Sequence, residues 1–267
     1  MNILRIYQRF WLVTWAEQWQ YRANLLMYVL YWIVQPIVYI AVWTSIANAQ
    51  GSVKGFTAND FIVYYLTILI VDQITSETVF YNMSYKIQDG TMAGELIRPV
   101  HPILTNSLMG TLAFKALTTL VLIPILILLI LLFRPQFDPV SATNLLLAIP
   151  ALLLGFAIGF LITASITCVA FWTQRVWGLY RLYGIPFALF SGQFVPVQLM
   201  PKVVQQITYL LPFQLFKYFP AQLVLGKLSA EEILQGYVSG IIWLIVSWFL
   251  FRFMWSRGLK QFSAVGA

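Results

Sequence analysis

Charged residues are scarce in this sequence. Only 9% of its 267 residues are Asp, Glu, Lys or Arg, and 60% are hydrophobic. Soluble domains carry about 25% charged residues, because a surface in contact with water has to be covered by them. The composition therefore excludes a soluble globular enzyme, and the apolar content excludes a disordered chain. We expect an integral membrane protein.

Cysteine and histidine are almost missing as well. Cys168 and His101 are the single residues of their types, which excludes an intramolecular disulfide and metal sites that need several thiolates or two imidazoles. The sequence has no Gly-x-x-x-x-Gly-Lys-Ser/Thr loop for nucleotide phosphates and no Gly-x-Ser-x-Gly nucleophile motif. We expect neither catalysis nor a bound metal or cofactor in this chain. If ATP powers its function, ATP and Mg²⁺ bind to a partner subunit.

Long apolar runs are plentiful. A helix needs about 20 apolar residues to cross the hydrocarbon layer. Six stretches meet this length and predict an all-α integral membrane protein, with one domain of six transmembrane helices over residues 25–267. The predicted spans are 25–47, 61–82, 112–133, 145–172, 179–197 and 237–255.

A seventh apolar region, 203–225, is interrupted by Pro212 and Pro220 and contains Lys217. Proline removes a backbone donor and breaks a helix. We therefore interpret residues 197–236 as an external re-entrant or interfacial helical hairpin between spans five and six. Broken backbone at membrane depth is tolerated only where protein or water satisfies its polar groups, so this hairpin should cap the bundle or line a path.

The first 24 residues form a separate amphipathic unit. On a helical projection, Leu4, Tyr7, Trp11, Trp15 and Trp19 fall on one arc. Tryptophan and tyrosine favour the headgroup region, so we expect a helix lying along the cytoplasmic membrane surface. It serves either as an anchor or as a helix that carries force from a cytoplasmic partner into the first span.

The Lys and Arg residues are unevenly distributed between the two sides. With six spans, eleven of the sixteen fall on the side that carries both termini. The positive-inside rule places that side in the cytoplasm. We expect a multi-pass protein of the bacterial plasma (inner) membrane, with both termini cytoplasmic. The net charge of +7 then reflects this bias and contact with the lipid bilayer, and no nucleic acid is expected as a partner.

Asp72 and Glu77 lie inside the predicted second span. A charge at mid-bilayer costs a few kcal/mol and by default marks a functional position. Polar neighbours such as Gln73, Thr75 and Ser76 indicate that this part of the helix faces protein or water. Two interpretations remain open: a role in the substrate pathway, or a buried, hydrogen-bonded structural role.

The segment after the second span, residues 83–111, is the longest predicted cytoplasmic loop. It is charged, contains Gly90 and Gly94, and carries Pro99 and Pro102 near its end. Because these residues break helices, a short amphipathic helix between them should project into the cytoplasm. This loop is the largest feature available for docking a partner.

Two motifs resemble those of one family, the membrane subunits of type-2 ATP-binding-cassette exporters. The family loop reads approximately Gly-Thr-Leu-Glu-x-Leu-Leu-x-x-Pro, and this chain has Gly90-Thr91-Met92-Ala93-Gly94-Glu95-Leu96-Ile97-Arg98-Pro99. Ala93 stands at the usual acidic position, and Glu95 follows two residues later. The second motif, Ser-Gly with later prolines and Leu-Pro, matches Ser191-Gly192, Pro196, Pro201 and Leu211-Pro212. Residues 97–100, 220–226 and 263–266 are most similar to one subgroup, in which two related permeases often work together.

The resemblance implies a permease that pairs with an ATPase subunit dimer and with a second permease, identical or related. It implies export of an amphiphilic or lipid-like substrate from the cytoplasm or the inner leaflet. The external gate would include Gly192, Pro196, Pro201 and Pro212. The residues that contact the ATPase would be Ile87, Asp89, Gly90, Thr91, Met92, Glu95, Leu96, Arg98 and Pro99.

A secondary transporter is the main alternative. In that case an ion gradient would drive transport, with Asp72 or Glu77 as the proton site. Residues 1–133 and 134–267 show no internal match of the kind common in such carriers. Co-purification of a nucleotide-binding subunit would distinguish the two.

Overall fold

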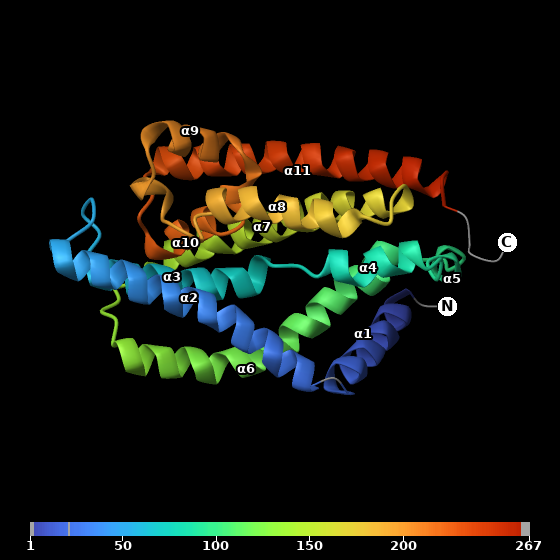
Figure 1. Cartoon of the computed structure of the whole chain (residues 1–267), viewed down its shortest axis with the longest axis horizontal. Coiled ribbons are helices and arrows are strands. Elements are labelled where there is room, and N and C mark those ends of the chain that lie inside the picture. Colours follow the sequence, from blue (N-terminus) through green and yellow to red (C-terminus); the bar gives the residue numbers. More distant parts are fainter. Residues whose placement is uncertain (1–2, 21, 263–267) are drawn as a thin grey trace.

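The computed structural model describes residues 3–20 and 22–262, which form a helical bundle with most helices along its long axis (Figure 1). The expected all-helical class is confirmed. In chain order the elements are α1 (Ile3–Gln20), α2 (Arg22–Gln50), α3 (Ala58–Thr75), α4 (Val79–Gln88), α5 (Ala93–Leu96), η1 (Ile103–Leu108), α6 (Met109–Phe133), α7 (Ala142–Cys168), η2 (Val169–Phe171), α8 (Val176–Phe190), η3 (Val197–Leu199), α9 (Lys202–Leu210), η4 (Pro212–Leu215), α10 (Tyr218–Leu225) and α11 (Ala230–Leu259).

Five helical segments of the described residues are long and apolar enough to cross a membrane, so the chain is a multi-pass membrane protein. They overlap the predicted first, second, third, fourth and sixth spans, and they are Met27–Gln50, Ala58–Gln88, Ile103–Phe133, Ala142–Phe171 and Ala230–Leu259.

The predicted fifth span corresponds to α8, which has 15 residues and ends at Phe190. At 1.5 Å per residue this helix covers about 22 Å, less than the roughly 30 Å of hydrocarbon in a bilayer. The chain leaves the helix at Ser191, where Gly192 adopts a φ of 81°. The count of six spans therefore stays a prediction.

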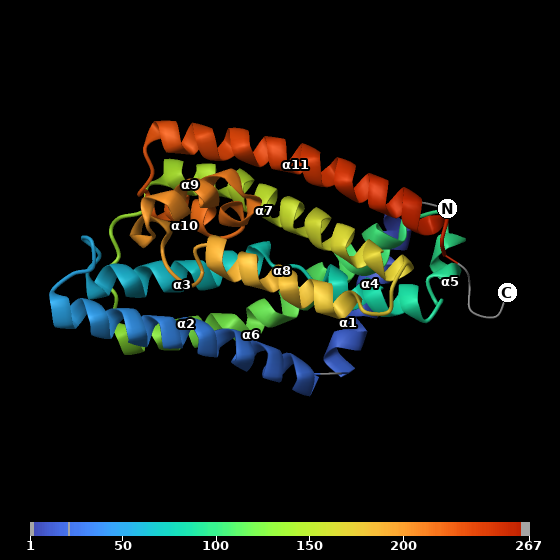
Figure 2. The same ribbon diagram turned by 45° about the horizontal axis from the view of Figure 1, so that its top comes forward.

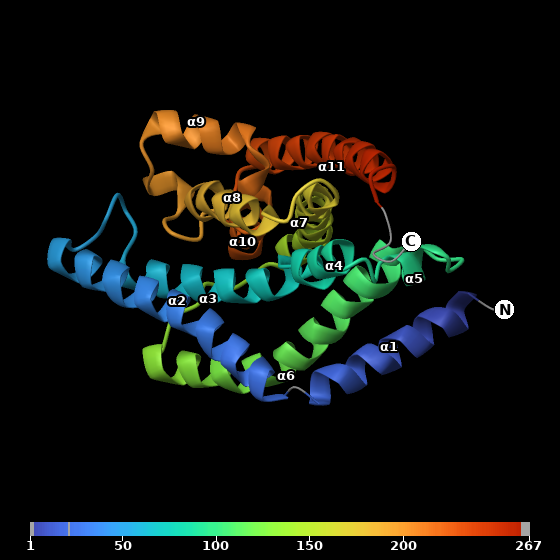
Figure 3. The same cartoon turned by 45° about the vertical axis from the view of Figure 1, so that its right-hand side comes forward.

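Helix α7 is the central element of the bundle. It packs against α3, α4, α8, α10 and α11, and α7 and α11 run side by side in both Figure 1 and Figure 2. On another side, α2 packs on α3, and α1 packs on α6. The beginning of α1, the end of α11 and α5 lie at one end of the bundle (Figure 1, Figure 3), which we call the terminal end. We call the opposite end, near α9 and α10, the hairpin end.

Three prolines in and just before the 197–236 segment stand at element starts, and Pro220 lies in the first turn of α10. Pro196, Pro201 and Pro212 lie at or directly before the first residues of η3, α9 and η4, positions where a missing amide donor costs nothing. Element η4 and most of α10 are buried within the bundle, whereas α9 is mostly exposed. The re-entrant position of this segment in a bilayer stays a prediction.

Close packing of α7 on η4 depends on Gly155. A Cβ atom at Gly155 would lie 2.5 Å from the carbonyl oxygen of Leu215. This is closer than a side-chain carbon can approach a backbone oxygen. Small residues let segments pack at such short range in membrane proteins. Gly155 therefore sets how deeply η4 enters the bundle.

We expect Gly155→Ala to lower the midpoint of thermal unfolding in detergent, because α7 and η4 must move apart. Gly178→Ala on α8 is the matched control, since a Cβ atom there meets nothing within 4 Å and alanine favours a helix by about 1 kcal/mol over glycine. Equal midpoints for the two variants would contradict this role of Gly155.

Candidate functional site

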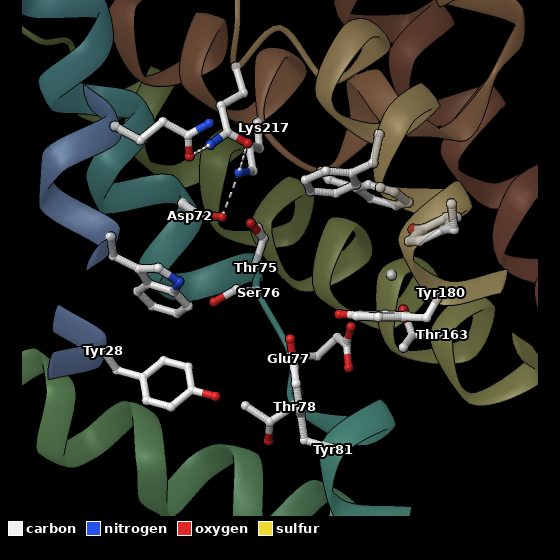
Figure 4. A pocket seen from close by; sticks show the side chains of 18 of the residues that line it. Tyr28, Asp72, Thr75, Ser76, Glu77, Thr78, Tyr81, Thr163, Tyr180 and Lys217 are labelled. Atoms are coloured by element: carbon white, nitrogen blue, oxygen red, sulfur yellow. Dashed lines mark hydrogen bonds and ion pairs between the residues drawn. The ribbon is translucent and has the colours of Figure 1, made fainter. Parts of the chain in front are cut away.

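The predicted second span is interrupted. Helix α3 ends at Thr75 and α4 begins at Val79, with Ser76 in an extended conformation between them. Figure 4 shows this break beside a cavity. A helix break inside a membrane frees carbonyl groups on one side and amide groups on the other, and both need partners.

A lysine from α6 satisfies the end of α3. The Nζ of Lys115 donates to the carbonyl oxygens of Gln73 at 2.8 Å and Ile74 at 2.7 Å. In return, the Gln73 amide donates to the Lys115 carbonyl and to the hydroxyls of Thr118 and Thr119. A cation is favourable at the negative end of a helix dipole, so α6 stabilises the point where α3 stops.

An acid from the break itself satisfies the start of α4. The Val79 amide donates to Oε2 of Glu77 at 2.7 Å, and the Thr78 amide donates to the Thr111 hydroxyl at 3.2 Å. A carboxylate is favourable at the positive end of a helix dipole. The signs of Glu77 and Lys115 thus match the two helix ends that they contact.

Asp72 forms an ion pair with a residue of the predicted hairpin. Its Oδ1 lies 2.8 Å from Nζ of Lys217, whose side chain is only 3% exposed, against 21% for Asp72. Lys217 also donates to Oε1 of Gln193, and Gln193 donates to Oε1 of Gln35 at 2.6 Å. This network joins α2, α3, the loop after α8 and the start of α10 (Figure 4).

Asp72 and Glu77 line the same cavity, which has a volume of about 750 Å³ and lies between α2, the α3–α4 break, α7 and α8. Much of its wall is aromatic: Tyr28, Trp32, Tyr81, Phe114, Trp177, Tyr180, Tyr183, Phe187 and Phe216. Drug-sized ligand sites typically have volumes of about 300–1,000 Å³ and mostly apolar walls with a few polar groups. The geometry fits the interpretation of both acids as pathway residues, and the contacts of Asp72 and Glu77 give each a structural role as well.

The predicted gate motif is tied to the first two spans. The carbonyl of Gly192 accepts from the Tyr64 hydroxyl at 2.7 Å, and the carbonyl of Phe194 accepts from the Tyr65 hydroxyl at 2.9 Å. At Gly192 a Cβ atom would lie 2.8 Å from that of Tyr218. The glycine of the Ser-Gly motif is therefore required by its positive φ and by close packing.

The predicted coupling residues divide into anchors and exposed groups. Ile87 and Met92 are buried in a cluster with residues of α7 and α11, and Leu96 packs against it. Glu95 is buried too, with Oε1 at 2.6 Å from Nζ of Lys86. Glu95 thus holds the loop together, rather than standing free for a partner.

A tight turn precedes α5. Gly90 has a φ of 80°, and Oδ1 of Asp89 accepts from the amide and the hydroxyl of Thr91 at 3.0 and 2.7 Å. These hydrogen bonds, the amide first, hold the pKa of Asp89 below its usual value. The Asp-Gly-Thr sequence therefore fixes the direction in which the next residues leave α4.

Ile97, Arg98 and Pro99 form the longest exposed run of this loop, in which Asp89, Thr91 and Gly94 are also exposed. The side chain of Ile97 is 87% exposed, which is unusual for an aliphatic residue next to a tightly anchored loop. Residues 97–99 lie close to α5, at the terminal end of the bundle (Figure 1). We call them the exposed tip.

Sequence reasoning missed the helix break and the two lysines that serve this site. The Lys and Arg count places Lys115 on the cytoplasmic side and Lys217 on the external side, yet Lys115 lies within α6 and Lys217 is buried. Leaving out these two lysines removes one residue from each side of the Lys and Arg count. The excess on the side of the termini, which predicts the orientation, therefore remains. The run Ser76-Glu77-Thr78 was the available signal, because short polar residues compete for helix backbone groups.

The comparisons with known proteins point to one family. The family model described as "ABC-2 family transporter protein" matches residues 11–266. A search of curated proteins found no match.

We expect Lys217→Met or Asp72→Asn alone to destabilise the protein by about 3–5 kcal/mol, because each leaves a buried partner without its counter-charge. The double variant should recover part of this loss, giving a measurable coupling energy in a double-mutant cycle of unfolding in detergent. Lys227→Met is the control. Its nitrogen lies 3.7 Å from Asp60 and its side chain is 48% exposed, so a change of at most about 1 kcal/mol is expected. If the losses in unfolding free energy of the two single variants simply add in the double variant, the pairing of Asp72 with Lys217 would be contradicted.

Proposed function

The chain belongs to the ABC-2 transporter family, whose model covers nearly all of it, and from this membership we propose that it is the permease of an exporter driven by a separate ATPase. The whole-chain family match is the observation that carries the proposal. The chain lacks a nucleotide-binding loop of its own. A pair of ATPase subunits supplies ATP hydrolysis, and ATP and Mg²⁺ bind there.

The exposed tip is the contact for the ATPase. Ile97 offers an apolar side chain, and Arg98 and Pro99 follow it in the chain. Buried Ile87 and Met92 and the Lys86–Glu95 ion pair fix the loop to the bundle. Because a rigid loop moves with the helix that carries it, force applied to the tip reaches α4.

The α3–α4 break gives that force a place to act. Helix α4 connects the loop to Glu77 and the cavity within about three turns. A ligand or partner shifts a conformational equilibrium only through different affinities for the two states. The ATPase must therefore bind the tip differently in its open and closed forms, and α4 transmits that difference to the cavity wall.

The terminal end faces the cytoplasm of a bacterial plasma membrane, with both chain termini on that side. A second permease, identical or related, completes the pathway. The substrate is amphiphilic, in keeping with an aromatic cavity that also contains charged groups. The proposal assigns the loop around Gly192 to the external gate, since side chains of the first two spans hold it.

Proton-driven transport is the weaker alternative. Asp72 is already paired with Lys217, which engages its carboxylate in a structural contact. That alternative would therefore depend on Glu77.

We expect Ile97→Asp to reduce stimulation of the partner ATPase by roughly tenfold, because a charge replaces the apolar contact at the interface. The measurement is ATP hydrolysis by the co-purified complex in lipid nanodiscs. Ile97→Val should retain most of the stimulation. Leu210→Ala, at a similarly exposed residue of the hairpin end, should leave it unchanged.

Wild-type stimulation by Ile97→Asp would rule out the exposed tip as the contact. Failure of any ATPase subunit to co-purify from native membranes would overturn the permease assignment itself. Glu95→Gln is a poor probe of contact, because it also breaks the ion pair with Lys86.

A further inference from the structure

We propose that the cavity beside the α3–α4 break binds amphiphilic organic cations, meaning molecules with an ammonium or phosphonium group on an apolar body. This inference rests on the proposed function and names its substrate class. Three features carry it: the arrangement of charges around the cavity, its aromatic walls and its size.

Asp72, Glu77 and Lys217 all line the cavity, and Lys115 lies outside the lining. Asp72 is more exposed than Lys217, its ion-pair partner. The ammonium of Lys115 is directed to the carbonyls of Gln73 and Ile74. Because Lys217 is only 3% exposed and is paired with Asp72, a ligand in the cavity meets mainly the oxygen atoms of the two acids.

Glu77 is the acid of the lining that lacks a close cation. Within the described part of the chain, no Lys, Arg or His nitrogen forms an ion pair with its carboxylate. Its Oε2 accepts from the Val79 amide, while Thr163 and Tyr180 lie beside it in Figure 4. In a low-dielectric site such a charge attracts a cation far more strongly than it would in water.

Arg181 is the second basic residue of the lining, beside Lys217. Its side chain is exposed, so water and ions screen its charge more than they screen that of Glu77. Arg181 would repel a cation only weakly, and the charge of Lys217 is already paired with Asp72. An anionic ligand beside the break would face the carboxylate of Glu77. The charge arrangement at the break thus favours a cation.

Aromatic residues surround the cavity on several sides. Tyr180, Tyr183 and Trp177 come from α8, while Tyr28 and Trp32 come from α2. Figure 4 shows Tyr28 across the break from Tyr180. The faces of aromatic rings attract organic cations, and aromatic cages recognise quaternary ammonium groups in this way. An aromatic wall next to a carboxylate serves both the charge and the apolar body of such a ligand.

The volume of about 750 Å³ suits a ligand of drug size. Tetraphenylphosphonium and tetraphenylborate make a sharp pair of probes, since they share size and shape and differ in the sign of charge. Binding of each radiolabelled ion would be measured by equilibrium dialysis against the permease with its co-purified ATPase, in phosphatidylcholine nanodiscs. Uptake by empty nanodiscs is subtracted.

We expect the phosphonium to bind at least tenfold more tightly than the borate. Glu77→Gln should weaken phosphonium binding at least tenfold, and its amide oxygen can still accept from Val79. Tyr180→Leu should weaken binding as well, whereas Tyr180→Phe should retain it. Glu231→Gln, at an exposed acid in the first turn of α11, should leave binding unchanged and serves as the charge-matched control.

Equal affinity for the two ions, or unchanged phosphonium binding in both Glu77→Gln and Tyr180→Leu, would overturn the proposal. If Glu77→Gln does not fold, the comparison of phosphonium binding between Tyr180→Leu and Tyr180→Phe still tests the proposal. Either of these binding results leaves the permease assignment intact if Ile97→Asp still reduces ATPase stimulation in the same preparation. A complex without an ATPase subunit would instead overturn the proposed function.

Discussion

The unmet backbone groups of an interrupted helix are the constraint on which the site depends. Lipid offers no hydrogen bonds, so a span that stops and restarts inside the bundle needs internal donors and acceptors. Lys115 supplies the donor for α3, and Glu77 supplies the acceptor for α4. These two residues give the interrupted backbone its hydrogen-bond partners, and the break holds Glu77 at the cavity wall.

The break connects the two ends of the molecule. Towards the hairpin end, Asp72 joins α3 to Lys217 and through Gln193 to the loop after α8. Towards the terminal end, α4 continues into the tight turn at Gly90 and the exposed tip. A single interrupted span therefore contacts the predicted gate, the cavity and the predicted coupling loop. Tilting α4 relative to α3 would alter the cavity without unfolding either helix.

Hydropathy and turn residues were sufficient to predict the helical class, most spans and the loop around Gly90, because these depend on local sequence. The break was not predictable in this way, since residues 76–78 contain neither proline nor glycine. Its stabilising partner Lys115 is distant in sequence, as is the partner of Asp72. Glu95 shows the same limit: its charge suggested a contact for another protein, yet burial beside Lys86 makes it an internal brace.

The Asp72–Lys217 pair also has a consequence for how the chain is made. Asp72 enters the bilayer with the second span, whereas Lys217 is translated only after more than half of the remaining chain has been added. Until then the carboxylate lacks its counter-charge, and a charge exposed to lipid is costly. A nascent chain that ends before η4 would therefore carry an uncompensated acid within the membrane. The second half of the chain thus supplies the counter-charge that the first half lacks until Lys217 has been made.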